Sequence, residues 1–147
     1  MNITVEWSEP YSLRDGSDRY LIYACDDLDS FPREPGVYIF ARRYGNTVCP
    51  LYIGQTLNIY KRIVQHFKFS LVLMNKIKKK AKAGDRIVLF GIPKLAPGQQ
   101  VERVLQVLEH ALIGNALAQG HELLNVHGTN IPAHYITNRG NPTSRSM

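Results

Sequence analysis

The sequence has 147 residues and a formal net charge of +6, with 18 lysines and arginines against 12 aspartates and glutamates. This length predicts a single domain. No apolar run reaches the ~18 residues that a membrane-spanning helix needs, and the N-terminus lacks the basic start of a signal peptide. The two cysteines, Cys25 and Cys49, fit no zinc or redox spacing, so we expect a cytoplasmic protein without a disulfide.

The charge is divided unevenly along the chain. Residues 1–34 hold eight acidic and three basic side chains, a net charge of −5. Residues 35–147 hold four acidic and fifteen basic side chains, a net charge of +11. A basic body of this kind favours a polyanionic partner, above all nucleic acid, although a solvated basic surface explains the charge about equally well.

The first half of the chain predicts short strands and one hairpin. Alternation and aromatic or β-branched content predict strands over residues 3–7 and 19–25, followed by a polar connector over 26–36. Two further strands, over 37–43 and 48–53, flank Gly45-Asn46, a typical hairpin turn. Pro50 cannot donate to a strand ladder, so it predicts a bulge or an edge strand.

The second half predicts three helices and one strand. Helical periodicity runs over residues 57–67, after Thr56 or Asn58 as the cap, and over 70–82 and 99–119, with a strand over 85–93 between the last two. Gly120 ends the last helix. From residue 126 onward the chain is rich in turn formers, and we expect residues 138–147 to be frayed.

Two similar tripeptides lie at matching ends of the predicted hairpin. They are Gly36-Val37-Tyr38 and Tyr52-Ile53-Gly54. Antiparallel pairing would bring Tyr38 and Tyr52 side by side, with Gly36 and Gly54 leaving room for a substrate beside the phenols. Two core tyrosines in an ordinary hairpin are the alternative interpretation.

The helix after the hairpin carries Arg62 and His66 four residues apart, so they are neighbours on one helical face. They fall at the edge of the apolar arc, where side chains reach into a cleft between a helix and a sheet. An arginine there suits a phosphate, and a histidine can exchange a proton near neutral pH. Taken singly, each is more commonly a solvated surface residue.

Glu109 falls inside the apolar arc of the last helix. A carboxylate there requires a partner, because burying an unpaired charge is costly. A divalent cation such as Mg²⁺ is one such partner, and an ion pair with Arg62 or a lysine is the alternative. Glu102, two turns earlier, is the rival metal ligand.

The ordered set of these motifs resembles the GIY-YIG nuclease domain over roughly residues 35–130. The resemblance implies an α+β fold with a small three-stranded antiparallel sheet flanked by helices. Residues 1–34 would then form an acidic N-terminal extension packed on the core, and residues 131–147 a turn-rich C-terminal tail. It also implies metal-dependent cleavage of a DNA phosphodiester, with Mg²⁺ or Mn²⁺ as the cofactor.

The resemblance further implies roles for individual residues. Glu109 would hold the metal, Arg62 would contact the phosphate, and His66 would relay a proton or position the water. Tyr38 would orient or deprotonate the attacking water, while the choice of base between Tyr38 and His66 stays open. The remaining site residues would be Tyr52, hydrogen-bonded within this network, and Asn125, which orients a neighbour or the phosphate, with Asn115 and Asn130 as its alternatives.

Basic side chains outside these motifs are candidates for DNA backbone contacts. They are Lys76, Lys79 and Lys80 on the second helix, and Arg42 and Arg43 near the hairpin turn. The acidic N-terminal segment would either add strands to the sheet or shield the basic surface. The alternative function is a nucleic-acid-binding module that has lost catalysis, or a nuclease activated by a partner. A homodimer or a protein partner would then supply target recognition.

Overall fold

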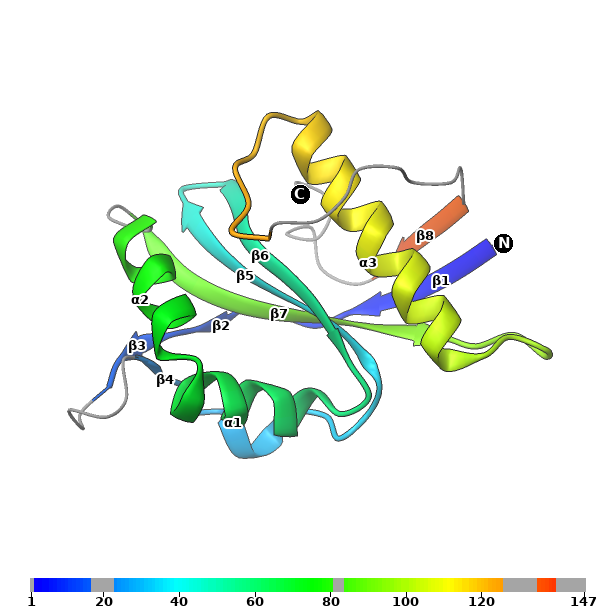
Figure 1. Cartoon of the computed structure of the whole chain (residues 1–147), viewed down its shortest axis with the longest axis horizontal. Helices are drawn as coiled ribbons and strands as arrows, with labels where there is room; N and C mark the ends of the chain where they lie inside the picture. Colours follow the sequence, from blue (N-terminus) through cyan, green and yellow to red (C-terminus); the bar gives the residue numbers. More distant parts are fainter. Residues whose placement is uncertain (1, 17–22, 81–83, 126–134, 140–147) are drawn as a thin grey trace.

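The computed structural model describes residues 2–16, 23–80, 84–125 and 135–139 (Figure 1). One six-stranded sheet runs in the order β6-β5-β7-β1-β8, and β2 also pairs with β7. The strands are β1 (Asn2–Trp7), β2 (Tyr11–Ser12), β5 (Gly36–Tyr44), β6 (Thr47–Thr56), β7 (Asp85–Lys94) and β8 (Tyr135–Arg139). A separate two-stranded sheet joins β3 (Arg14–Asp15) to β4 (Tyr23–Ala24).

The expected α+β fold is confirmed, and its antiparallel centre consists of β5, β6 and β7. Beyond these three strands, β1 and β2 extend the sheet antiparallel to β7, as one of the two alternatives for the N-terminal segment predicts. The turn-rich region after residue 126 contains a strand that we did not predict, since β8 pairs parallel to β1, and Asn138 and Arg139, which we expected to be frayed, belong to it. A five-residue strand at a sheet edge depends on its partner strand for stability, so its local sequence does not predict it.

Helices cover both faces of the central sheet (Figure 1). The helices are α1 (Ile59–Phe69), α2 (Leu71–Lys80) and α3 (Val101–Ala118), with a short 3₁₀ turn, η1 (Leu28–Ser30), in the predicted connector. One core cluster lies between the sheet and α1 and α2, and a second lies between the sheet and α3. Within the described ranges, no helix is both long and apolar enough to cross a membrane.

Alternate residues of β5 divide between these two clusters. Val37 and Ile39 pack on the α3 side, whereas Tyr38 and Phe40 pack on the α1 and α2 side. This is the two-residue period of a strand that is covered on both faces. The period therefore decides that Tyr38, the tyrosine of the first tripeptide, faces α1.

Local signals account for the ends and the irregularity of these elements. Asn58 rather than Thr56 caps α1, since its side chain accepts a hydrogen bond from the Lys61 amide at 3.0 Å. Pro50 lies in the edge strand β6, and the register shifts beside its partner Ala41, so the predicted edge and bulge are both present. Of the strand predicted over 19–25, residues 19–22 lie outside the described residues.

The acidic N-terminal segment adds strands to the sheet, which is one of the two alternatives considered for it. Its strands β1 and β2 belong to the main sheet. In addition, the Asp15 carboxylate lies 3.3 Å from Arg86 and 3.6 Å from Lys78, so it neutralises part of the basic surface.

Candidate active site

Tyr38 and Tyr52, the tyrosines of the two similar tripeptides, lie diagonally across the β5–β6 hairpin. In this register Tyr38 is opposite Gly54, and Tyr52 is opposite Phe40. The ring centroids of Tyr38 and Tyr52 are 6.3 Å apart, a distance typical of diagonal neighbours. The tyrosines are therefore close, as expected, although they do not face each other directly.

The space beside Gly54 belongs to the Tyr38 ring. A Cβ atom built at Gly54 would lie 2.3 Å from both Cζ and Oη of Tyr38. At Gly36, a Cβ atom would lie 2.7 Å from the carbonyl oxygen of Gly91. The expectation that these glycines leave room for a substrate is therefore wrong, because protein atoms fill both spaces. Gly54 allows the phenol to lie across its backbone, and Gly36 allows close packing against β7.

His66 is buried inside a box of aromatic rings. Its ring centroid lies 5.3 Å from Tyr38, 5.7 Å from Phe40 and 5.9 Å from Tyr52, and only 2% of the residue is exposed. The helical wheel placed it at the edge of the apolar arc, but the hairpin wraps around it. Burial and the nearby Arg62 guanidinium together lower the pKa of His66 from 6.5 to about 4, so the imidazole is neutral at pH 7.

The hydroxyl of Tyr38 contacts both of the α1 side chains of the site, Arg62 and His66. Its oxygen lies 2.7 Å from Nε2 of His66, and it accepts a hydrogen bond from Nε of Arg62 at 3.3 Å. Arg62 and His66 reach the same atom because they lie one turn apart on α1. Burial raises the pKa of Tyr38 well above its usual range, against the opposing effect of the Arg62 hydrogen bond. Tyr38 is therefore protonated in the free protein.

Tyr52 contributes a ring rather than a hydrogen bond to this cluster. It is half-buried and packs against Tyr38, Phe40 and His66. We expected it to hydrogen-bond within the network, but no hydrogen bond joins its hydroxyl to the other described site residues. Sequence analysis missed Phe40, although its place two residues after Tyr38 in one strand puts it on the same face.

Glu109 is buried on α3 at 8% exposure. His66 and Glu109 are the buried polar or charged side chains within the described ranges, and both are predicted site residues. The Glu109 carboxylate lies near enough to Tyr38 to help raise the pKa of the phenol. Glu102, its rival as a ligand, is exposed in the first turn of the same helix.

The donor set fits a hard cation that takes few ligands from the protein. No cluster of three or more histidine, cysteine, aspartate or glutamate side chains suited to a metal occurs in the part of the chain that the structure describes. Mg²⁺ is commonly held by one or two carboxylates, with water and substrate phosphate completing its shell. The single buried carboxylate of Glu109 matches that pattern, whereas a closed site made of protein ligands alone does not.

Asn125 binds the backbone of the edge strand. Its Oδ1 accepts from the Ile53 amide at 2.9 Å, and its Nδ2 donates to the Ile53 carbonyl at 2.6 Å. The Leu124 amide also donates to the Leu51 carbonyl at 2.8 Å. Asn125 thus holds β6 between Tyr52 and Gly54, which favours the role of orienting a neighbour. Asn115 is exposed on α3, and Asn130 lies outside the described residues.

The predicted DNA-contacting residues do not form a single row. Lys76 and Lys79 are exposed on α2. Arg43 lies 3.8 Å from the Asp85 carboxylate, and Lys80 lies 3.2 Å from the Glu122 carboxylate. Arg42 is half-buried and shares a pocket with Lys80. The basic residues therefore differ in how much of their charge is already neutralised.

Comparison with known proteins matches the middle of the chain to a catalytic domain. The GIY-YIG catalytic domain matches residues 34–112, which is more than half of the chain. Over 43 residues, the chain is 51% identical to the UvrABC system protein C of Deinococcus radiodurans. That match spans 29% of this chain and 6% of the relative. No solved structure matches the chain.

Proposed function

Because the chain belongs to the GIY-YIG family, whose domains are nucleases, we propose that it is a metal-dependent endonuclease that hydrolyses phosphodiester bonds in DNA. The observation that supports this most is the Tyr38 oxygen, which Arg62 and His66 hold at 3.3 and 2.7 Å. A buried phenol held by a guanidinium and a neutral imidazole is suited to move a proton rather than to stabilise a core. A nuclease domain of this family acts on nucleic acid, and the charge of the chain from residue 35 onward suits that substrate.

Tyr38 is the group that orients the attacking water and receives its proton. Because burial disfavours a phenolate, Tyr38 releases its own proton only as the water proton arrives, and no net charge builds up on the phenol. Nε2 of His66 is the acceptor by its position 2.7 Å away on a neutral imidazole, and the negative charge of a bound phosphate would offset the burial that lowers the pKa of His66 to about 4. The imidazole proton then sits on Nδ1, a buried atom without a hydrogen-bond partner among the described residues. In this scheme Tyr38 and His66 act in series, so each of the two candidates for the base has a part in the proton transfer.

Arg62 and Glu109 take the phosphate side of the reaction. The Nε and Nη1 atoms of Arg62 donate to Tyr38 and to Gln65, and its remaining N–H groups can bind a phosphate oxygen. Glu109 would hold Mg²⁺ or Mn²⁺, which, when bound, lowers the pKa of water and offsets negative charge on the phosphate. The new P–O bond forms from the water oxygen as the bond to the leaving oxygen breaks, and solvent supplies the leaving group with a proton.

A plasmid-nicking assay with two matched glutamate variants tests this proposal. Wild type is assayed with Mg²⁺ or Mn²⁺ and with EDTA, beside Glu109→Gln and Glu102→Gln. We expect nicking that EDTA abolishes, a loss of at least ~100-fold in Glu109→Gln, and no change in Glu102→Gln, whose side chain is exposed on the same helix. Full activity in a folded Glu109→Gln protein would overturn the proposed metal ligand.

A second candidate function is a nuclease that needs a partner. Its support is that Tyr38 is 1% exposed and His66 is 2% exposed, so water and phosphate reach the phenol only after a local movement. Binding of a partner or of the correct DNA structure could supply that movement. Weak nicking by wild type alone, with strong nicking after a partner is added, is the result that separates this candidate from a free-standing enzyme.

A further inference from the structure

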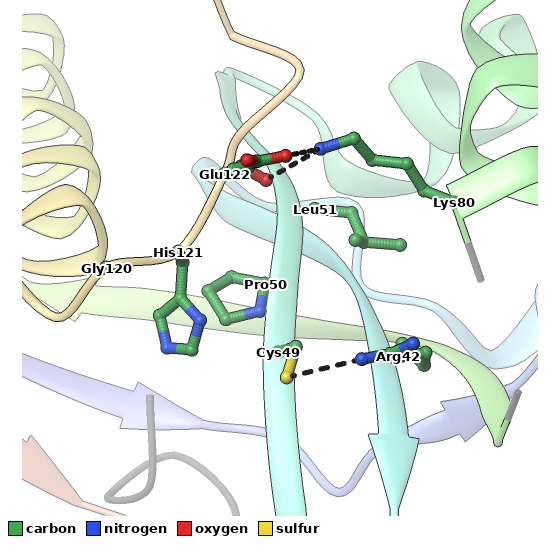
Figure 2. Close-up of a pocket in the computed structure, with 8 residues that line it drawn as sticks. All are labelled: Arg42, Cys49, Pro50, Leu51, Lys80, Gly120, His121 and Glu122. Carbon is green, nitrogen blue, oxygen red and sulfur yellow. Dashed lines mark hydrogen bonds and ion pairs between the residues drawn. The ribbon is translucent and has the colours of Figure 1, made fainter.

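A pocket near the hairpin turn gathers two cations beside the edge strand. It has a volume of about 300 Å³, and its lining includes Arg42, Cys49, Lys80 and Glu122 (Figure 2). Figure 2 places Arg42 beside Cys49 at one end and the Lys80–Glu122 pair at the other. The pocket therefore lies between the end of α2, the strand β6 and the segment that follows α3.

Arg42 is the unusual residue of this pocket, because its cross-strand neighbours do not balance its charge. In the sheet it lies opposite Cys49 on β6 and opposite Arg86 on β7. Like charges directly opposite each other destabilise a sheet. Arg86 has the Asp15 carboxylate at 3.3 Å to offset this, but within the described residues Arg42 forms no ion pair.

The hydrogen bonding of Arg42 is also incomplete. Its Nε atom is buried without a partner among the described residues. Its Nη2 atom reaches only the Cys49 sulfur, at 4.0 Å, and sulfur is a weak acceptor. A guanidinium held in this state is suited to an anion with several oxygens, because its fork of donors matches phosphate geometry.

Lys80 can supply the second cation. Its ion pair with Glu122 is 3.2 Å long, and the Glu122 side chain is 88% exposed. An exposed pair of this kind contributes little to stability, so an entering phosphate can replace the Glu122 carboxylate. Glu122 thus lies where a competing anion would bind.

The position of the pocket relates it to the proposed catalytic centre. Tyr38, Phe40 and Arg42 alternate along β5, so their side chains share one face of the sheet. Four residues of strand place Arg42 about 13 Å from Tyr38. Phosphates recur every ~3.4 Å of helix axis along one DNA strand, so ~13 Å along the axis corresponds to about four nucleotides, and to fewer where the backbone runs obliquely to the axis. A strand bound at both places therefore puts about two to four nucleotides between them.

We propose that Arg42 and Lys80 form a second phosphate subsite, which holds the DNA backbone about two to four nucleotides from the scissile phosphate. The proposal rests on the proposed nuclease function and adds a contact that the catalytic residues do not make. It selects Arg42 over its neighbour Arg43, because adjacent residues of the strand β5 point to opposite faces of the sheet.

The first test measures binding to a DNA duplex by fluorescence anisotropy in EDTA, over a series of salt concentrations. Arg42→Ala should weaken binding about tenfold and reduce the salt slope by about one, as expected for one lost phosphate contact. Arg43→Ala, which removes the same charge one residue away, should change both much less. Glu122→Gln should tighten binding, because it removes the competing anion. Equal salt slopes in Arg42→Ala and Arg43→Ala would overturn the subsite.

The second test locates the bound phosphate. On a duplex whose cut site has been mapped with wild type, single phosphates are replaced by uncharged methylphosphonates. Neutralising one phosphate two to four nucleotides from the cut should weaken DNA binding by wild type, and should weaken binding by Arg42→Ala much less, because that variant retains only the Lys80 contact. If wild type cleaves this duplex but no phosphate in that range behaves in this way, the proposed subsite is overturned.

The failure of the nuclease function itself would look different. If wild type neither cuts nor binds DNA, a probe smaller than DNA is needed. Inorganic phosphate titrated against the Arg42 Nε–H signal in NMR, assigned with Arg42→Lys, still tests the pocket. A saturable shift supports an anion subsite, and no shift overturns it. Arg42→Lys also keeps the charge if Arg42→Ala fails to fold.

Discussion

Replacing Gly54 with alanine is the sharpest test of how the hairpin positions Tyr38. The added Cβ atom would lie 2.3 Å from Cζ and Oη of Tyr38, whereas ordinary contacts begin near 3.4 Å, so the ring must withdraw by about 1 Å. A shift of that size breaks the 2.7 Å contact with His66 and the 3.3 Å hydrogen bond from Arg62. Displacing a reacting group by about 1 Å can lower the rate about 100-fold.

The same substitution should also lower stability. Overpacking a filled site typically costs about 1–3 kcal/mol, and the Tyr38 ring is completely enclosed. Urea unfolding measures this loss, and single-turnover nicking of plasmid DNA measures the rate. If Gly54 instead left room for substrate, Gly54→Ala would raise KM without changing stability.

A double-mutant cycle with Tyr38→Ala makes the reasoning refutable. Without the ring, the alanine at position 54 meets none of the three contacts that produce the clash. Gly54→Ala should therefore destabilise wild type by about 1–3 kcal/mol and the Tyr38→Ala background much less. An equal loss in both backgrounds would show that the Tyr38 ring does not explain the glycine.

Three further predictions concern single side chains. His66 has a pKa of about 4 in the fold against 6.5 unfolded, so its neutral form contributes about 3 kcal/mol above pH 6.5. Wild type should lose that part of its free energy of unfolding as the pH falls from 6.5 to 4, and His66→Gln should not show this loss. If the free energies of unfolding in urea fell in parallel with pH for the two proteins, the prediction would be contradicted. Asn125→Asp should destabilise the fold by about 1–3 kcal/mol and remove the hydrogen-exchange protection of the Ile53 amide, because it loses the Nδ2 donor at 2.6 Å. Unchanged protection would argue against the tether. Asn58→Ala should cost about 1 kcal/mol in thermal unfolding through loss of the α1 cap, whereas Thr56→Ala should cost less.

Much of the fold and of the candidate site could be predicted from local patterns in the sequence. The Gly45-Asn46 turn, the edge position of Pro50 and the four-residue spacing of Arg62 and His66 each depend on residues close together in the chain. Helical periodicity alone placed Glu109 in the buried arc of α3, where the structure has it. These features could be predicted because turn chemistry and helical or strand period are properties of short segments.

Features that need two distant segments were decided by the tertiary structure. The hairpin register, shifted by a bulge, puts Gly54 rather than Tyr52 opposite Tyr38 and changes the meaning of the glycine. Packing of the hairpin against α1 buries His66, and burial is what lowers its pKa. The pairing of β8 with β1, and the pocket that joins Arg42 to Lys80, likewise have no local signal. Periodicity says which way a side chain points along its own element, but long-range contacts decide what it meets there.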